Sequence, residues 1–397
     1  MKLLEVSDAR ARILATVSQV PAEEAPLCAA LGRVLAADIR AGRAQPPFDA
    51  SAMDGWAVRA ADTPGRLKIV GESAAGHGYA GALAAGESVR IFTGAAVPWG
   101  ADWIVIQEDA QRDGDHVIAP AAALPNHIRA AGMDFSAGER LLERGVRLDP
   151  WRLALAAAAG HGIVSVSRRP QVVILSTGEE VVPPGASPGP FQIFDSGSTA
   201  LQALATTWGA EVSLLAGVGD DAEATANAVA RGGGDLVVTL GGASVGDHDI
   251  VKPALGRLGL ELRVESVAVR PGKPTWFGVL GDGRKVLGLP GNPASALVCA
   301  ELFLKPLLLA MQGADPALPM EAAVLDAALR ANGAREHWMR ARLSRRADGR
   351  LSAAPFPDQD SSLVSVFAEA DALIRRAAGA PALGRGEIVE TLRLARL

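Results

Sequence analysis

The chain has 397 residues, of which 49 % are hydrophobic, and it carries a formal net charge of −5. This length and apolar content allow two to four domains, each with its own core. The negative charge argues against a nucleic-acid-binding protein, which usually presents a basic face.

The cysteines and the apolar runs bear on the compartment. Cys28 and Cys299 are far apart and form no CxxC motif, which indicates a reducing compartment and two thiols in apolar surroundings. The first residues, MKLLEVSDARARIL, lack the features of a signal peptide. The most apolar run, 153–159, is too short to span a bilayer. We therefore expect a cytoplasmic protein that contacts no membrane.

The first part of the chain alternates between helical and β-like patterns. Apolar residues recur at helical spacing over 3–19, and the stretches 24–38 and 141–162 also favour helices. Between them, short strand-like runs such as LKIV, SVRIF, WIVIQ and HVIAP are separated by Gly, Pro and Asp. This pattern predicts a mostly-β domain inserted into a helical one.

The second part reads as a parallel sheet followed by a small β domain. Three apolar runs end in polar, Gly-bearing loops: QVVILSTGEE, DLVVTLGGASVGD and KVLGLPGNP. Helical stretches are expected over 196–208, 221–231, 249–258 and 293–311, the last kinked at Pro306. Buried strands alternating with helices predict a doubly wound parallel sheet with ligand loops at the strand carboxyl ends.

These patterns predict a multi-domain chain of the α/β plus β class. The expected domains are a helical domain of residues 1–45 and 136–169, an inserted β domain of 46–135, an α/β domain of 170–318 and a C-terminal β domain of 319–397.

Two of the strand-end loops carry groups suited to a phosphate. In LPGNPAS, Asn292 is a good N-cap, Gly291 allows close backbone approach, and the following helix favours an anion at its start. The alternative is an ordinary capped helix. In the second loop, Ser176, Thr177 and Gly178 precede Glu180, a set that can hold a phosphate and a metal or form a solvated turn.

A third strand-end loop, residues 241–249, is rich in glycine and acids. Gly241, Gly242 and Ser244 allow a backbone nest for an oxyanion, and Asp247 and Asp249 can supply oxygen ligands to Mg²⁺. Such a loop is a weak signal alone. Three of them at successive sheet ends form a much stronger one.

The turn RPGKP places two cations, Arg270 and Lys273, around a Pro-Gly pair. Their spacing suits a compact oxyanion such as phosphate, sulfate or molybdate, although a basic surface turn has the same composition. Acids such as Asp195 and Asp221 near an anion site require a bridging hard cation, so we expect Mg²⁺.

The inserted β domain has its own polar motifs, at 48–57 and 93–98. Asp54 and Thr93 are turn-forming residues, so a structural role is open to them. Their density in an otherwise apolar chain favours the wall of a site.

Six motifs, taken in order, resemble the molybdopterin molybdenumtransferase (MoeA) family, whose animal relative is the carboxy-terminal part of gephyrin. They are PPFDASAMDGWAV, FTGAAVPWGAD, STGEE, GGASVGDHD, RPGKP and LPGNPASA. The resemblance covers residues 3–395 and implies an elongated four-domain homodimer, with the α/β domain as the molybdopterin-binding-like module. It also implies a Mg²⁺-dependent reaction in which adenylylated molybdopterin and molybdate give molybdenum cofactor and AMP.

The resemblance also implies roles for single residues. It assigns catalytic acids at Asp54, Glu180, Asp221 and Asp249, and metal ligands at Asp247 and Asp249. It assigns molybdate binding to Arg270, Lys273, Ser295, Arg340 and Ser361, and it assigns Pro274 to substrate binding without a named group. The remaining substrate-binding residues are Thr93, Asp134, Ser176, Thr177, Gly178, Asp195, Gly241, Gly242, Ser244, Gly291 and Asn292.

The sequence departs from the family pattern at a few positions. Arg270 stands where the family usually has lysine, Trp56 replaces tyrosine, and Gly197 replaces asparagine. None of these changes removes a charge that the reaction needs, but a planar guanidinium differs from an ammonium as a ligand.

Three other functions compete with this interpretation. A molybdopterin adenylyltransferase would need only the sheet domain and would release pyrophosphate. A scaffold would lack activity, and a molybdate sensor would ignore the adenylylated pterin. Under the family interpretation we expect transient contacts with the adenylyltransferase and with acceptor molybdoenzymes, and no nucleic-acid partner.

Overall fold

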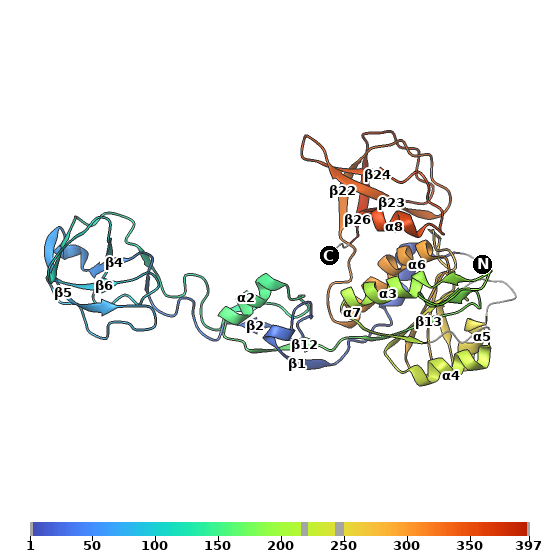
Figure 1. The fold of residues 1–397 in the computed structure, drawn as a ribbon, viewed down its shortest axis with the longest axis horizontal. Helices are drawn as coiled ribbons and strands as arrows, with labels where there is room; N and C mark the ends of the chain where they lie inside the picture. The colour runs from blue at the N-terminus through green and yellow to red at the C-terminus, as the bar shows by residue number, and fades with distance from the viewer. Residues whose placement is uncertain (1–2, 216–220, 243–249, 395–397) are drawn as a thin grey trace. The chain divides into compact units, whose positions relative to one another are not determined.

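The computed structural model describes residues 3–215, 221–242 and 250–394 (Figure 1). The chain divides into two compact units: a smaller unit of residues 24–166 and a larger unit that joins 1–23 to 167–397. The α/β plus β class is confirmed, with a doubly wound parallel sheet, an inserted β domain and a small C-terminal β domain.

The part of the smaller unit outside the inserted β domain, residues 24–45 and 136–166, is less helical than predicted. We call this part the stem. The stretch 24–38 is wrong as a helix: it holds part of β1 (Ala22–Pro26), a 3₁₀ turn (Leu27–Ala29) and extended chain, because β1 pairs with a distant strand and Gly32 has a φ of 74°, outside the helical range. Of 141–162 only α2 (Pro150–Ala158) is helical, and the Asp149 carboxylate caps it by accepting from Arg152 N at 2.8 Å. Two strand pairs complete the stem, β1 with β12 (Ile163–Ser167) and β2 (Ile39–Arg40) with β11 (Arg140–Leu142).

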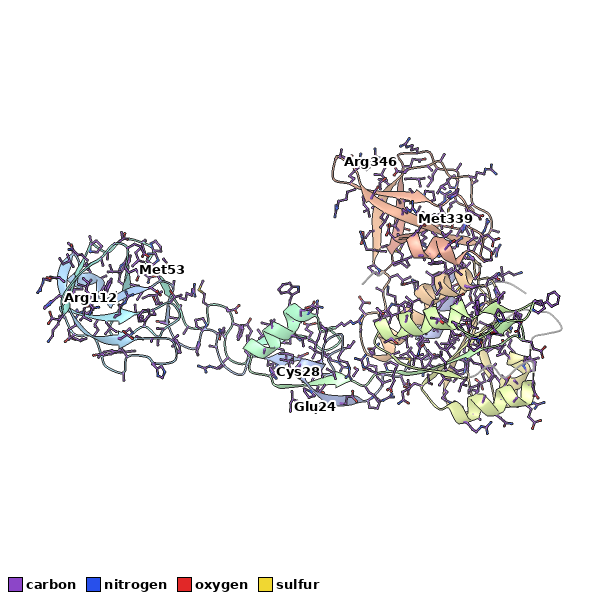
Figure 2. The ribbon with its side chains drawn as sticks, in the orientation of Figure 1. Glu24, Cys28, Met53, Arg112, Met339 and Arg346 are labelled. Atoms are coloured by element: carbon purple, nitrogen blue, oxygen red, sulfur yellow. The ribbon has the colours of Figure 1, made fainter. Side chains whose placement is uncertain are left out.

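Cys28 lies on this stem and is exposed (Figure 2). The prediction of two thiols in apolar surroundings is therefore wrong for Cys28 and confirmed for Cys299, which is buried.

The inserted β domain is a six-stranded sheet, and each of the four predicted runs falls in one of its strands. In sheet order the strands are β7 (Trp103–Ile106), β4 (Gly55–Val58), β6 (Glu87–Ile91), β5 (Gly65–Ser73), β9 (His116–Ala119) and β8 (Gln111–Asp113). Both faces of the sheet are apolar. One core includes Trp56 and Val117, and the other includes Ile91 and Ile104. A short pair, β3 (Ala50–Ser51) with β10 (Ile128–Arg129), lies beside it.

The sheet of the larger unit has four parallel strands followed by two antiparallel ones. Its order is β16 (Glu211–Leu215), β13 (Gln171–Ser176), β17 (Leu236–Leu240), β21 (Lys285–Leu289), β20 (Trp276–Val279) and β18 (Glu261–Val264). Alternate residues of β13 point to opposite faces, so Ile174 joins one core and Leu175 the other.

Helices cover both faces of this sheet. The first core includes α1 (Val6–Leu14), α3 (Ser196–Thr207) and the helix 293–311, and the second includes α4 (Ala222–Gly232) and α5 (Val251–Gly256). The α1 helix is shorter than the predicted 3–19 and packs into the sheet core. Residue 249, the predicted start of the α5 helix, lies outside the described residues.

The helix 293–311 does not run straight through. It consists of α6 (Pro293–Cys299), a π-helical turn (Ala300–Leu304) and α7 (Lys305–Met311). The π turn directly precedes Pro306, which has no N–H to continue the ladder. This segment of 19 residues is long and apolar enough to cross a membrane, but 83 % of it is buried inside the fold. Its apolar surface is therefore core surface.

The C-terminal domain closes into a barrel. Strand β23 (Glu336–Arg345) pairs with β24 (Leu351–Pro355), which is followed in order by β22 (Met320–Leu325), β26 (Ile388–Arg393) and β25 (Ala372–Arg376), and β25 pairs back with β23. The alternating runs AVLDAAL, HWMRARL, LSAAP and IVETLRL predict four of these strands from the sequence, whereas no pattern predicts β25 or the helix α8 (Val364–Glu369). A strand from the sheet domain, β19 (Val269–Arg270), pairs in parallel with the start of β23.

Gly55 allows two strands of the inserted domain to approach each other. A Cβ at this position would lie 1.9 Å from the backbone oxygen of Val105, whereas a Cβ at Gly162 would meet nothing within 4 Å. We expect Gly55→Ala to destabilise the smaller unit by about 1–3 kcal/mol or more, because backbone must move, while Gly162→Ala stays within about 1 kcal/mol of the parent. The measurement is the midpoint of thermal unfolding of each variant, taken from the transition of the smaller unit. Equal midpoints would contradict the packing described here.

Candidate functional site

Two adjacent pockets open at the carboxyl ends of the parallel strands in the larger unit. The first, the sheet-edge pocket, has a volume of about 850 Å³ and is formed by the loops after β13, β17 and β21 and by the start of α3. The second, the cationic pocket, has a volume of about 930 Å³ and lies between the RPGKP turn, the LPGNP loop and the C-terminal barrel. Pro274, Pro290 and Asn292 line both pockets, so the LPGNP loop and the turn form their common wall.

Most of the predicted site residues line one of these pockets. The sheet-edge pocket contains Ser176, Thr177, Gly178, Glu180, Asp195, Gly241, Gly242 and Gly291. The cationic pocket contains Arg270, Lys273, Ser295 and Ser361, and Pro274 and Asn292 belong to both. The three strand-end loops therefore meet, as the sequence predicted.

In the sheet-edge pocket the first two loops are in direct contact. The Thr177 backbone N–H and hydroxyl donate to Leu240 O at 3.0 and 3.2 Å. Gly241 has a φ of 82°, and a Cβ there would lie 2.9 Å from Thr177 Oγ1. A side chain at this position would force the loops apart, so glycine is needed for their close approach.

The same pocket combines carboxylates with apolar surface. Asp195 is the N-cap of α3 and accepts from Ser198 N at 2.8 Å, which fixes its orientation at the pocket wall. Glu180 precedes the short ribbon formed by β14 (Val181–Val182) and β15 (Ile193–Phe194), and Ile193 and Phe194 also line the pocket. Such a site can accept a ligand with both charged and planar apolar parts.

The other acidic residues that the sequence predicts for this site lie outside the two pockets or outside the described residues. Asp221 lines neither pocket and caps α4 by accepting from Glu223 N and Ala224 N at 2.7 and 3.0 Å, which lowers the pKa of its carboxyl. Ser244, Asp247 and Asp249 lie outside the described residues. Within the described ranges no group of three or more His, Cys, Asp or Glu side chains is arranged to hold a metal.

The RPGKP turn rests on helix α6. Gly272 has a φ of 113°, and a Cβ there would lie 2.1 Å from Cys299 Sγ. Thr275 Oγ1 donates to Gly272 O at 2.8 Å and closes the turn. Burial raises the pKa of Cys299 to about 12, so its thiol stays protonated and serves as the floor of the turn. The charged groups of Arg270 and Lys273 form no ion pair with any residue that the structure describes.

The start of α6 is tied to the barrel rather than capped by its own side chain. Asn292 occupies the N-cap position, but its amide donates to Ser361 Oγ at 3.0 Å and makes no capping bond. The prediction of Asn292 as the N-cap residue is therefore confirmed for its position, while its side chain binds the C-terminal domain. Ala294 N also donates to Ser361 O at 3.1 Å. These two bonds hold Ser361 next to the buried Ser295 at the pocket wall.

Arg340 does not line either pocket, in contrast to its predicted contact with molybdate. It is fully buried, and its guanidinium donates to Asp360 O at 2.9 Å and Leu363 O at 3.1 Å. It also packs on the Phe367 ring, with 5.6 Å between Cζ and the ring centroid. The adjacent residues of β23 pack in the barrel core, so Arg340 lies on the opposite face of the strand, where it holds the loop that carries Ser361.

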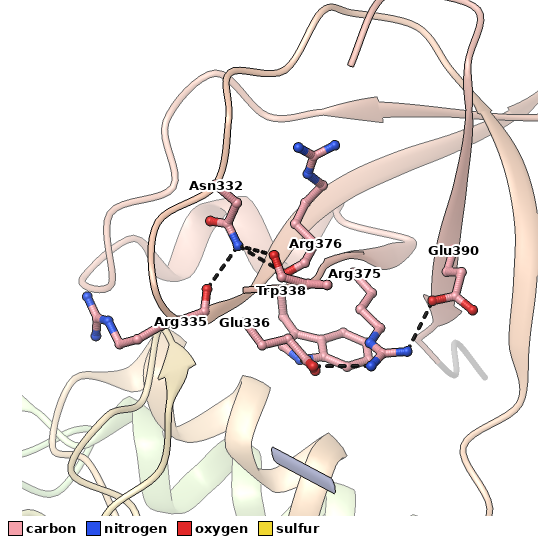
Figure 3. A network of polar contacts seen from close by, with 8 residues as sticks. Asn332, Arg335, Glu336, Trp338, Arg375, Arg376 and Glu390 are labelled. Atoms are coloured by element: carbon pink, nitrogen blue, oxygen red, sulfur yellow. Dashed lines mark hydrogen bonds and ion pairs between the residues drawn. The ribbon is translucent and has the colours of Figure 1, made fainter. Parts of the chain in front are cut away.

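The sequence analysis missed the barrel residues of the cationic pocket. They are Arg330, Asn332, Arg335, His337 and Arg376. Asn332 fixes this wall, since its amide donates to the carbonyls of Arg335, Arg376 and Ala377 at 2.9, 3.1 and 2.7 Å (Figure 3). The only available signal was the density of arginine around two strands, which is also typical of a solvated β surface.

His337 is the most perturbed group in this wall. It is 7 % exposed. Burial, and then Arg270, Arg340, Arg335 and Arg376, lower its pKa to about 4, so the imidazole is neutral at neutral pH.

Two carboxylates also line the cationic pocket, Asp358 and Asp360. Asp360 accepts from the Ser362 N–H and hydroxyl at 2.8 and 2.6 Å, which lowers its pKa, and Asp358 accepts from Asp360 N at 2.8 Å. Five cations (Arg270, Lys273, Arg330, Arg335 and Arg376) outnumber these two acids. The pocket is therefore suited to an anion.

The predicted residues of the β domain belong to the smaller unit. Asp54 accepts from the Thr93 N–H at 2.7 Å and from its hydroxyl at 2.8 Å, and these bonds lower the pKa of the Asp54 carboxyl. Asp134 lines a separate hollow of about 590 Å³ together with Phe48, Arg129 and other residues. Within this unit, Asp54 and Thr93 act as one bonded pair and Asp134 stands apart from them.

Family models match nearly all of the chain. Residues 4–160 match the MoeA N-terminal region (domain I and II), residues 173–310 a probable molybdopterin binding domain, and residues 322–394 the MoeA C-terminal region (domain IV).

Named relatives match with similar coverage. The chain is 38 % identical over 346 residues to molybdopterin molybdenumtransferase 2 of Mycobacterium tuberculosis, covering 83 % of this chain and 85 % of that one. It is 40 % identical over 328 residues to the molybdopterin molybdenumtransferase of Synechococcus elongatus, covering 78 % and 80 %. The crystal structure of the molybdopterin biosynthesis MoeA protein from Pyrococcus horikosii is similar over 100 % of both chains, with 32 % identity and a TM-score of 0.85.

The lowered pKa of His337 predicts a pH dependence of stability. Between the folded value of about 4 and the usual 6.5, the unfolded chain binds more protons, so the free energy of unfolding falls as the pH falls through this window. At pH 5 this loss amounts to about 2 kcal/mol relative to pH 7.5. Denaturant unfolding of the larger unit should show that His337→Gln, which cannot titrate, removes this part of the loss. An identical pH dependence in both proteins would contradict the assignment.

Proposed function

Since the chain belongs to the MoeA family and is a molybdopterin molybdenumtransferase of molybdenum cofactor biosynthesis, we propose that it inserts molybdate into adenylylated molybdopterin and releases AMP. The observation that carries the finer proposal is the common wall of the two pockets, formed by Pro274, Pro290 and Asn292. A site for a small oxyanion and a site for a larger phosphate ester therefore adjoin each other.

Molybdate would bind in the cationic pocket. Arg270 and Lys273 are available to an anion, and Ser295 and Ser361 offer hydroxyls nearby. A dianion would relieve the repulsion among these cations, and the fixed turn would hold it without a large loss of side-chain freedom. Arg340 would act through the loop that it holds rather than by touching the anion.

Adenylylated molybdopterin would bind in the sheet-edge pocket. The hydroxyls of Ser176 and Thr177 and the glycine backbone of the loops suit the pyrophosphate link, and the apolar edge suits a ring system. Binding next to molybdate would bring the reacting groups into one region, so that the insertion gains from proximity. Of the catalytic acids that the sequence predicts, Glu180 is one that lines this pocket.

The oxygen donors of the sheet-edge pocket fit a hard cation such as Mg²⁺. Glu180 and Asp195 would face it, together with Asp247 and Asp249 as predicted from the sequence. When bound, Mg²⁺ would neutralise charge on the pyrophosphate link. Glu180 and Asp195 would orient that link, and Asp221 would contribute through the helix α4 that it caps.

We also propose a cytoplasmic homodimer in which Asp54, Thr93 and Asp134 serve the cleft of the partner subunit. The polar density of their motifs in an otherwise apolar domain supports this role. Transient contacts with the adenylyltransferase and with acceptor molybdoenzymes would deliver the substrate and receive the product.

The test is molybdate-dependent AMP release from adenylylated molybdopterin. Lys273→Ala should lose at least about tenfold in apparent molybdate affinity, because a charge-assisted contact is removed, while the melting temperature stays within about 1 °C. Arg270→Lys should keep activity, since the positive charge remains.

Lys68→Ala, which removes an exposed lysine of β5, is the matched control and should behave as the parent. Release of pyrophosphate instead of AMP would identify an adenylyltransferase. Normal turnover of Lys273→Ala at limiting molybdate would refute the proposed molybdate site.

If each cleft is shared between two subunits, two inactive variants with lesions in different subunits should restore activity when combined. Asp54→Ala and Lys273→Ala, each inactive at limiting molybdate, should recover about a quarter of the parent activity when mixed in equal amounts and re-associated. About half of the two-fold dimers are then mixed, and each mixed dimer has one intact cleft. Subunit exchange is verified with two affinity tags. A mixture that exchanges subunits and stays inactive would show that both residues serve the same subunit, or that Asp54 is structural.

A further inference from the structure

Strand pairing aligns three side chains along one wall of the cationic pocket. In the parallel pair of β19 with β23, Arg270 is the partner of His337, and in the antiparallel pair of β23 with β25, His337 is the partner of Arg376. Directly paired residues on neighbouring strands project to the same face of a sheet. All three residues line the cationic pocket, so they form a row in which an imidazole stands between two guanidinium groups.

The imidazole in this row has an unused hydrogen-bonding atom. His337 is 7 % exposed, and its Nε2 is buried without a hydrogen-bond partner among the described residues. A buried polar atom without a partner costs free energy, and such atoms are rare in native proteins unless a ligand or water completes them. Nε2 itself is covered in the free protein, and the residue that carries it lines the pocket wall.

The charged groups around His337 indicate that a ligand bound there carries negative charge. The groups that act on it electrostatically are Arg270 of β19, Arg335 just before β23, Arg340 of β23 and Arg376 of β25, all positive. A neutral ring in this position can donate one N–H without adding a further charge to the row. A neutral donor between two cations is complementary to an oxyanion whose oxygens reach all three.

We propose that His337 is an oxyanion-binding residue that donates from Nε2, between Arg270 and Arg376, to the tetrahedral dianion held by the RPGKP turn. The proposal rests on the proposed molybdate site, which already includes Ser361 of the C-terminal domain, and adds a residue of strand β23 to it. The site is then assembled from two domains of the larger unit, and the β19–β23 pairing sets its geometry.

Molybdate binding to the full-length protein without pterin, measured by calorimetry, tests this assignment. His337→Phe keeps a buried ring but removes the donor and should weaken binding about tenfold or more, because a hydrogen bond to a charged group is lost. His337→Gln places an amide N–H near the position of Nε2 and should bind within about threefold of the parent. His77→Phe, a change at an exposed histidine of the smaller unit, is the matched control and should have no effect.

Lys273→Ala separates this inference from the proposed function. If Lys273→Ala binds weakly and His337→Phe binds as the parent, the role of His337 is refuted and the molybdate site stands. If neither variant changes the affinity, the molybdate site itself is refuted.

A measurement on the unmodified protein covers the case in which His337→Phe does not fold. At pH 7.5, molybdate should shift the ring resonances of His337 and slow the solvent exchange of its Nε2 proton, with the signal assigned through His337→Gln. Ring signals that stay unchanged at saturating molybdate would overturn the proposal.

Discussion

The pairing of β19 with β23 is the contact on which the cationic pocket depends. It consists of two residue pairs, Val269 with Glu336 and Arg270 with His337, yet it joins the RPGKP turn of the sheet domain to the wall of the barrel. Because neighbouring strands lie about 4.8 Å apart, this pairing fixes the spacing of charged side chains that come from distant parts of the chain. The bonds from Asn292 and Ala294 to Ser361 fasten the opposite side of the same pocket.

The pocket concentrates positive charge at a cost to the free protein. Arg270 and Lys273 have no carboxylate partner among the described residues, and the neighbouring arginines depress the pKa of His337. Such repulsion destabilises the fold unless an anion offsets it. The surrounding structure tolerates it because the turn is held rigidly: Gly272 packs on Cys299, and Thr275 closes the turn. Rigid cations lose little freedom when an oxyanion binds.

The sequence predicted the parallel sheet well because its signals are local. The apolar runs of β13, β17 and β21 each end in a glycine-bearing polar loop, and parallel strands bring such loops to one edge. The failures had longer-range causes. The stretch 24–38 forms strands and turns because tertiary pairing overrides its helical pattern, and the Asn292 side chain donates to Ser361 instead of making a capping bond. Arg340 looked like a ligand from its motif, but the strand register places it on the face of β23 opposite the barrel core, where it binds loop carbonyls.

The sequence by itself determined the buried runs of β13, β17 and β21, the three loops that follow them and the two cations of the turn, since each depends on residues close together in the chain. Only the tertiary structure decided that Arg330, Arg335, His337 and Arg376 join those cations in one pocket. Local periodicity shows which residues share a face of their own strand. It does not show which distant strand pairs with it or in which register, and register is set by packing of the whole fold.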